Sequence, residues 1–293
     1  MPFTAADLVA LFDIEPTLPD RFVGHSPKNG WPRVFGGQVV AQALVAASRT
    51  VEARAPHSLH AYFLLGGNPA EPISYEVERV RDGRSFTTRR VVARQRDEAI
   101  FVLSASFHRP EEGLDHQFPM PDAPDPESLV DPVAAIALLG EKAQKRLQGL
   151  LERIRPIEFR PLDFGRYTPM PPGSQREPKQ SLWVRIGGEL PEDPAIHRAA
   201  LAYLSDLTLL DTALVAHGRT VFDERFQVAS LDHSLWFHRP FRADDWLLYV
   251  QDSPNAYGAR GLTRGLLYDR AGALVASVAQ EGIVRSMRPA AQD

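Results

Sequence analysis

The stretch Ala43-Leu44-Val45-Ala46-Ala47-Ser48-Arg49-Thr50 can be laid over Ala213-Leu214-Val215-Ala216-His217-Gly218-Arg219-Thr220, with six of the eight positions identical at a shift of 170 residues. Further along, Ser58-Leu59 matches Ser230-Leu231 at a shift of 172, and the apolar run 100–103 matches 274–277 at a shift of 174. Matches that keep their order at a nearly constant shift predict an internal duplication.

Each predicted half begins with an apolar helix and continues with strands rich in Val, Phe, Thr and Tyr. Because the two helices are apolar on most of their circumference, we expect a sheet to wrap around each of them. A helix followed by antiparallel strands is an α+β pattern. The expected helices are 37–48 and 194–216, and the expected strands are 58–66, 73–81, 84–95 and 99–108 in the first half and 230–239, 245–252, 257–268 and 273–285 in the second.

Prolines mark the connection between the halves, because 11 of the 25 fall between Pro119 and Pro178. A helix is expected inside this passage, over about 133–153. The predicted organisation is therefore an N-terminal domain of residues 1–118, a Pro-rich linker of residues 119–178 and a C-terminal domain of residues 179–293. The first residues predict a short amphipathic helix with Leu8, Leu11 and Phe12 on one side.

Composition excludes several classes of function. The net charge of −4 leaves no basic stripe for nucleic acid. The chain has no cysteine, which excludes disulfides, thiol nucleophiles, zinc–thiolate sites and iron–sulfur clusters. The nine histidines show no metal-ligand spacing, so no metal site is expected. No apolar run is long enough to cross a membrane, and acidic residues near the N-terminus argue against a signal peptide. We therefore predict a cytoplasmic protein without a membrane partner.

The common catalytic and cofactor motifs are missing. The nearest approach to Gly-x-Ser-x-Gly is Gly24-His25-Ser26, which Pro27 and Lys28 break. Gly36-Gly37 opens the first predicted helix, where glycines can offer backbone N–H groups to an oxygen or allow close packing. Asp232-His233-Ser234 does not predict a catalytic triad, because neighbours on a strand point to opposite faces.

One acidic side chain, that of Asp206, lies in the apolar stripe of the second predicted helix. A buried carboxylate is costly unless it is hydrogen-bonded, so Asp206 is either a structural acid or a functional one. Gln280 shares strand parity with apolar neighbours and should face the same helix, and Ser230 begins the strand that follows it.

By the shifts above, the counterparts of Asp206, Ser230 and Gln280 in the first half are Gly36, Ser58 and Ser106. The first half then lacks the acid and the amide. Such an asymmetry is what a duplication with one surviving site would leave.

At this point the sequence resembles the acyl-CoA thioesterase II family over nearly its whole length, from about Leu8 to Arg285. Together the shared motifs are specific, although each alone is weak. They are Val34-Phe35-Gly36-Gly37-Gln38, His60-Ala61-Tyr62-Phe63-Leu64, Arg81-Asp82-Gly83-Arg84-Ser85-Phe86 and Asp232-His233-Ser234-Leu235-Trp236-Phe237-His238-Arg239-Pro240.

The resemblance implies a double hot-dog fold, with two tandem hot-dog domains that each wrap an antiparallel sheet around a helix. It also implies a catalytic group of Asp206 in Ser-Asp-Leu, Ser230 before the Asp-His-Ser run, and Gln280 in Ala-Gln-Glu-Gly, where the family has Val for Ala279. These three side chains would hold a water that attacks the thioester directly. No cofactor and no acyl-enzyme are implied, and the first half would carry only a degenerate site.

The implied substrate is a medium- to long-chain fatty acyl-CoA whose chain lies in an apolar cleft. The candidate substrate-binding residues are Gly37, His60, Tyr62, Arg84 and Arg260. The two arginines are equally well explained as solvated side chains. His57 and His60 are better explained as structural histidines than as bases, and the sequence does not decide whether Tyr62, Phe63 or Trp236 lines the cleft.

Two other functions stay open. A hot-dog enoyl-CoA hydratase needs a His about five residues after its Asp, whereas Asp211 stands there. A non-catalytic acyl-CoA-binding protein would bind the thioester without turnover. By analogy with the family we expect a homo-oligomer, a dimer or a tetramer.

Overall fold

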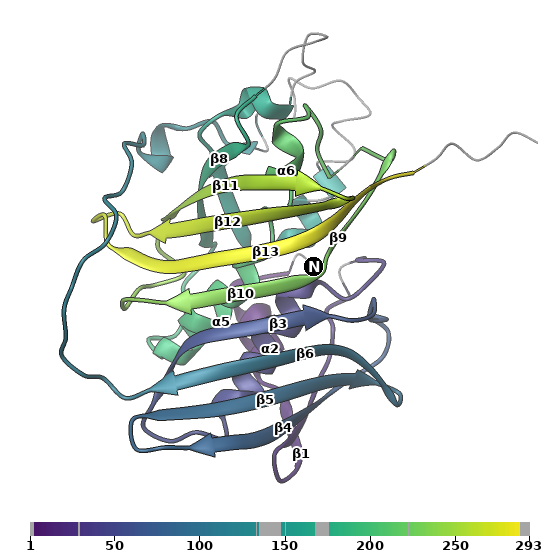
Figure 1. Ribbon diagram of the computed structural model, residues 1–293, viewed down its shortest axis with the longest axis vertical. Coiled ribbons are helices and arrows are strands. Elements are labelled where there is room, and N and C mark those ends of the chain that lie inside the picture. Colours follow the sequence, from purple (N-terminus) through teal and green to yellow (C-terminus); the bar gives the residue numbers. More distant parts are fainter. Residues whose placement is uncertain are drawn as a thin grey trace, which may run out of the picture.

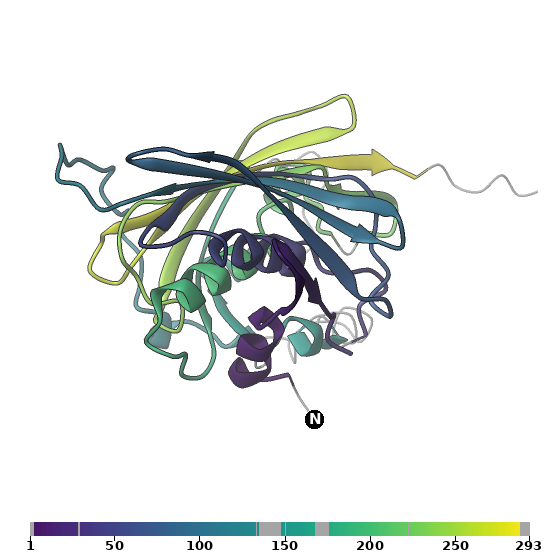
Figure 2. The same ribbon diagram turned by 90° about the horizontal axis from the view of Figure 1, so that it is seen from below.

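A single curved antiparallel sheet of 13 strands forms one face of the molecule, and helices fill its concave side (Figures 1 and 2). The computed structural model describes residues 3–28, 30–132, 134, 148–149, 151–167, 176–221 and 223–287. The strands are β1 (Glu15–Leu18), β2 (Arg21–Gly24), β3 (Ala55–Phe63), β4 (Ile73–Asp82), β5 (Phe86–Gln95), β6 (Glu98–His108), β7 (Ile157–Pro161), β8 (Lys179–Ile186), β9 (Phe226–Ser230), β10 (Asp232–Phe237), β11 (Leu247–Tyr257), β12 (Arg260–Tyr268) and β13 (Leu274–Ser286). The helices are α1 (Ala5–Phe12), α2 (Gly36–Ser48), α5 (Pro194–Ser205) and α6 (Thr212–Val215), with 3₁₀ turns at Pro126–Ser128 and Phe164–Tyr167.

The strand order shows the duplication directly. It runs β1-β2-β4-β5-β6-β3 and then β10-β13-β12-β11-β8-β7, so each half has the same arrangement when read from its own edge. The halves join where β3 pairs with β10, with Leu59 opposite Leu235. The predicted α+β class and the double hot-dog architecture are confirmed, although the sequence did not reveal the edge pairs β1–β2 and β7–β8.

Helices α2 and α5 pack against each other across the junction of the halves. The first turn of α2 meets the last turn of α5, because a Cβ on Gly37 would lie 2.2 Å from the carbonyl oxygen of Tyr203. Helix α2 is buried almost all round, as its apolar sequence predicts. Its two buried amides are satisfied: Gln38 donates to His25, and Gln42 donates to Leu11 and accepts from Tyr75.

The second predicted helix, 194–216, is not continuous. Helix α5 ends at Ser205, and the chain makes a series of turns before α6. Backbone bonds in this stretch run to the third residue back, as from Leu207 to Leu204, which tightens the helix. Thr208 holds the turn in place, because its carbonyl and hydroxyl oxygens accept from Gln180 and Gln251.

The eight-residue match at a shift of 170 therefore joins segments that are not equivalent. Residues 43–48 belong to α2, whereas 213–215 form α6. The position of α2 in its half, between the edge pair and β3, is occupied in the second half by α5. The duplication holds at the level of the fold, and the local identity does not locate its equivalent residues.

Register irregularities in the sheet correct the assigned counterparts as well. The pairing of β3 with β6 slips by one residue at His57, between Pro56 and Ser58. The pairing with β13 slips in the same way between Ser230, opposite Gly282, and Ser234, opposite Ala279. Superposing the two slips makes Pro56 the counterpart of Ser230 and Ala105 that of Gln280, in place of Ser58 and Ser106.

The cap positions give a third correction. Asp206 is the C-cap of α5, and Arg49 is the C-cap of α2. Arg49, rather than Gly36, is thus the counterpart of Asp206. The first half has neither the acid, the hydroxyl nor the amide at these positions.

Part of the predicted linker belongs to the second half, because β7 pairs with β8 at the edge of the sheet. Residues near the start of the linker cover the outer face of that sheet, where Trp183 donates to the carbonyl of Pro124 at 2.9 Å. Most of the expected helix 133–153 lies outside the described residues. The N-terminal helix forms as predicted, with a capping box between Thr4 and Asp7. In the part of the chain that the structure describes, no helix could span a membrane.

Gly265 tests the packing of the second half. A Cβ there would lie 2.2 Å from the ring of Tyr249, which is fully buried. Gly265→Ala should lower the free energy of unfolding by about 1–3 kcal/mol, measured by urea denaturation. The control is Gly113→Ala, where a Cβ meets nothing within 4 Å. Equal stability of the two variants would contradict the close packing.

Candidate active site

Asp206 ends helix α5 against the first turn of α2. Its side chain is only 6% exposed. A Cβ on Gly36 would lie 2.6 Å from Oδ2 of Asp206 and 2.9 Å from the ring of Phe63. A residue larger than glycine at position 36 would therefore displace the carboxylate. The glycine pair at the start of α2 serves close packing and also brings the backbone N–H of Gly37 to an acid.

The three side chains predicted as catalytic meet at one carboxylate oxygen. Nε2 of Gln280 donates to Oδ1 of Asp206 at 2.6 Å and to Oγ of Ser230 at 2.8 Å. Oγ of Ser230 lies 3.5 Å from the same Oδ1. The group combines three elements, since Asp206 follows α5, Ser230 ends β9 and Gln280 lies in β13.

Burial raises the pKa of Asp206 to about 6. Hydrogen bonds from Gln280, the backbone N–H of Gly37 and Ser230 favour the ionised form and oppose this effect. The carboxylate is therefore ionised at neutral pH and remains a much better proton acceptor than an exposed Asp. A base with such a pKa is suited to removing a proton near pH 7.

His233 lies beside the carboxylate, which the sequence did not reveal. Its Nδ1 is 4.0 Å from Oδ1 of Asp206, and its Nε2 lies 2.9 Å from Oγ of Ser205. Burial lowers the pKa of His233 to about 4, so the ring is neutral at physiological pH. Strand parity was the available signal, because His233 shares the inward face of β10 with Leu235 and Phe237.

Two hydrogen-bonding groups at the site have no partner among the described residues. Oε1 of Gln280 is buried and accepts no hydrogen bond, and Nδ1 of His233 is likewise unpartnered. Buried polar atoms of this kind are commonly satisfied by water. A water at this place would find acceptors on Asp206 and on Gln280.

The predicted substrate-binding residues are scattered. Gly37 is at the site, next to Asp206. His60 and Tyr62 lie on the outer face of β3, where His60 contacts Ser234 at 3.1 Å. The structure does not bring these two side chains to the carboxylate.

The two arginines are exposed on the surface. Arg84 lies in the turn before Phe86, which pairs with His108 at the end of the sheet where β3 begins. Asp206 is near Phe63, at the other end of β3. Arg260 is closer to the site, but it points outward and pairs with Glu281 at 3.0 Å. Neither side chain contacts Asp206, Ser230 or Gln280.

The remaining candidate residues differ in their distance from the carboxylate of Asp206. Phe63 faces Gly36 beside the site, whereas Trp236 packs on His60 at the outer face. His57 contacts Ser106 at 2.8 Å, at the far end of β3. Asp211, at the position where a hydratase would have its His, is buried and accepts from the backbone of Val221.

The Asp232-His233-Ser234 run is not a triad, as strand parity predicts. Its residues alternate between the two faces of β10, and Asp232 accepts a hydrogen bond from the backbone of Glu281 at 2.7 Å. Among the described residues no group of His, Asp or Glu side chains could hold a metal ion.

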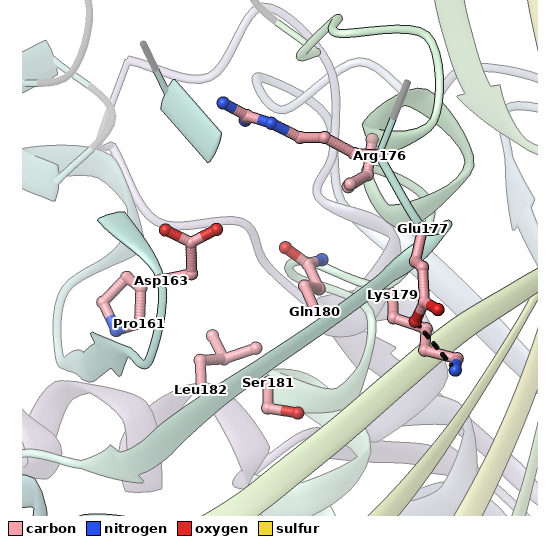
Figure 3. A pocket seen from close by; sticks show the side chains of 9 residues that line it. Pro161, Asp163, Arg176, Glu177, Lys179, Gln180, Ser181 and Leu182 are labelled. Atoms are coloured by element: carbon pink, nitrogen blue, oxygen red, sulfur yellow. Dashed lines mark hydrogen bonds and ion pairs between the residues drawn. The ribbon is translucent and has the colours of Figure 1, made fainter. Parts of the chain in front are cut away.

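A small cavity of about 340 Å³ opens beside β8, the end of β7 and Val215 of α6 (Figure 3). Gln180 points into it, and the ion pair of Lys179 with Glu177 lies at its edge. None of the three grouped side chains lines this cavity.

Comparisons with known proteins agree in both halves. A family model described as "Acyl-CoA thioesterase" matches residues 159–283, and one described as "Acyl-CoA thioesterase N-terminal domain" matches residues 26–108. The chain is 42% identical to human "Acyl-coenzyme A thioesterase 8" over 95% of this chain and 88% of the relative. It is 38% identical to "Acyl-CoA thioesterase 2" of Haemophilus influenzae, over 95% of this chain and 97% of that one.

A solved structure supports the same relationship. The chain is similar to an acyl-CoA thioesterase II, TesB2, from Mycobacterium marinum, with a TM-score of 0.78 and 40% identity. The likeness covers 96% of this chain and 98% of that one.

Asp206→Asn should stabilise the fold at high pH. Because the pKa rises from 3.8 in the unfolded chain to about 6 in the folded one, ionisation penalises the folded state fully above about pH 6 and not at all below about pH 4. The variant should gain about 1–3 kcal/mol at pH 8 and nothing at pH 4, measured by urea denaturation. Asp97→Asn, in an exposed turn, is the control. A variant less stable than the wild type at pH 8 would refute a strained buried carboxylate.

Proposed function

Because the chain belongs to the acyl-CoA thioesterase family, we propose that it hydrolyses medium- to long-chain fatty acyl-CoA with a water that Asp206 and Gln280 hold and that Ser230 positions through Gln280. The observation that carries the proposal is the contact of these three side chains around one buried carboxylate oxygen. The products are a free fatty acid and CoA. A cytoplasmic location and a homo-oligomer remain predictions.

The attacking water would donate one hydrogen bond to Asp206 and the other to Oε1 of Gln280, which is buried and unpartnered among the described residues. With both protons engaged, a lone pair of the water is free to face the thioester carbon. Ser230 fixes the amide of Gln280 by accepting from its Nε2. Such positioning lowers the entropic part of the barrier.

Attack forms a bond from the water oxygen to the carbonyl carbon while Asp206 takes a proton from the water. The negative charge that develops on the former carbonyl oxygen needs donors. The first turn of α2 is the nearest source, because Phe35 offers no side-chain cap there and Gly36 lies against the carboxylate. The backbone N–H of Gly37 already donates to Asp206, so the proposal assigns the oxyanion to the N–H of Gly36. The positive end of the helix dipole adds to its effect.

Collapse of the tetrahedral intermediate breaks the carbon–sulfur bond and releases CoA. The thiolate is a good leaving group, and the proton held by Asp206 returns to it or to solvent. His233 is neutral and has no hydrogen bond to Ser230. The only base beside the Ser230 hydroxyl among the described residues is Asp206, at the long distance of 3.5 Å, and the proposal assigns Asp206 to the water. The proposal therefore contains no acyl-enzyme.

The first test is CoA release from acyl-CoAs of about C4 to C18, followed with a thiol reagent; a chain without cysteine gives little background. Asp206→Asn should lose at least about a hundredfold in kcat/KM, within the range of a lost general base. In the wild type, kcat/KM should fall about tenfold per pH unit below pH 6, because protonated Asp206 cannot accept a proton.

Asp97→Asn serves again as the control and should keep full activity. Turnover that survives Asp206→Asn would place the base elsewhere. Binding of acyl-CoA without turnover in the wild type would favour the non-catalytic alternative.

Ser230→Ala separates direct attack by water from covalent catalysis. If Ser230 only fixes Gln280, the variant should lose about 10- to 100-fold in kcat, as expected for one or two hydrogen bonds. Loss of a nucleophile should abolish turnover and also any burst of CoA release in rapid-mix experiments. A burst in the wild type that disappears in Ser230→Ala would overturn the proposed mechanism.

A further inference from the structure

The duplicated fold has a second place equivalent to the candidate active site. The site described above lies where the end of α5 meets the start of α2. The pseudo-symmetric place is where the end of α2 meets the start of α5. A cavity of about 640 Å³ lies there, and it is called the α2–α5 cavity below; its lining includes Arg49, Pro56 and the first turns of α5 from Asp193 to Ala199.

The residue at the helix cap of this second place has the opposite charge. Arg49 stands at the cap position that Asp206 holds in the other half, and Pro56 stands in place of Ser230. The acid, the hydroxyl and the amide of the candidate active site therefore have no equivalents here, and the cavity lacks the group that the proposed hydrolysis needs. An acid has been replaced by a permanent cation.

The walls of the α2–α5 cavity are mainly apolar. Side chains of α1, α2 and α5 supply them, among them Phe12, Leu44, Val45 and Ile196. The volume is within the range of ordinary small-molecule sites. An apolar space of this size favours a ligand with a hydrocarbon portion.

The charged groups at its edge favour an anion. Three arginines, Arg49, Arg54 and Arg198, face two acids, Asp13 and Asp193. Arg49 is paired with Asp13 at 2.6 Å, and Arg54 donates to neutral oxygens, among them the carbonyls of Gly83 and Arg84. The cavity thus carries a net positive charge.

Arg198 is the decisive residue. It is half-buried, and none of the described residues accepts a hydrogen bond from its guanidinium group. Burial lowers its pKa, while the charge of Asp193 raises it. The carboxylate of Asp193 is engaged in capping α5, where it accepts from the backbone of Ala195 at 2.9 Å. A partly desolvated cation that has no acceptor among the described residues is available to an anionic ligand.

We propose that the α2–α5 cavity binds a free fatty acid, with its carboxylate on Arg198 and its hydrocarbon chain along the apolar walls between α2 and α5. A carboxylate matches the planar donor fork of arginine in a two-bond contact. The ligand class is that of the acid product of thioester hydrolysis, but the cavity is separate from the catalytic group and binding there does not depend on turnover.

The test is equilibrium dialysis of radiolabelled decanoate, with decanol as the uncharged comparison. Arg198→Met keeps the length of the side chain but removes its charge, and it should weaken decanoate binding at least tenfold while decanol binding changes less than about twofold. Ala195→Trp adds a large side chain at an exposed lining position and should abolish the binding of both ligands. Arg90→Met, on the solvent-exposed face of β5, is the matched control and should bind decanoate as the wild type does.

Three results would overturn the proposal: no decanoate binding in the wild type, equal binding in Arg198→Met, or undiminished binding in Ala195→Trp. The last would place the acid elsewhere, such as at the catalytic group. Arg198→Met and Ala195→Trp should both retain initial rates of CoA release within about twofold of the wild type. Hydrolysis without decanoate binding would refute only the second site, and decanoate binding without hydrolysis would refute only the proposed enzyme.

Discussion

The close contact between the first turn of α2 and the last turn of α5 is the constraint on which the rest of the site depends. A Cβ on Gly37 would collide with the backbone of Tyr203, and one on Gly36 would collide with the carboxylate of Asp206. The glycine pair lets the amino end of one helix approach the carboxyl end of the other. The approach buries an acid, raises its pKa and surrounds it with N–H donors. The close packing of the two helices and the raised pKa of Asp206 therefore both depend on glycine at positions 36 and 37.

The sheet supplies the other members of the group. Strand β13 places the amide of Gln280 against the carboxylate. Strands β9 and β10 both pair with β13, and the one-residue slip in that pairing leaves Ser230 facing the same oxygen. His233 closes the inner side as a neutral ring. Each of these side chains faces inward by the alternation of its strand. The apolar helix packing and the polar group thus share one surface of the sheet.

Much of this arrangement could be predicted from the sequence, because it rests on local periodicity. Seven of the eight expected strands, helix α2 and the inward faces of Gln280 and Asp206 follow from apolar spacing. The eighth, expected over 230–239 with Ser230 at its start, is wrong: Ser230 ends β9, and β10 begins at Asp232. The break after Ser205 could not be predicted, because it depends on Gln180 and Gln251, which are distant in sequence and hold Thr208. The eight-residue match aligned segments that are not structurally equivalent, because small apolar residues suit any buried helix. The contact of His233 with Asp206 also needed the fold, since strand parity gives a direction but not a neighbour.

The pairing of β3 with β10 joins two similar halves within one chain. If the halves were separate identical subunits, each substitution would occur twice, and an acid useful at one junction would be imposed on the other. Covalent linkage removes that restriction and makes the encounter of the halves independent of protein concentration. Each junction can then be selected for its own charge, which is how Asp206 and Arg49 come to occupy related cap positions with opposite signs. The tandem arrangement thus gives freedom to specialise that a symmetric dimer does not have.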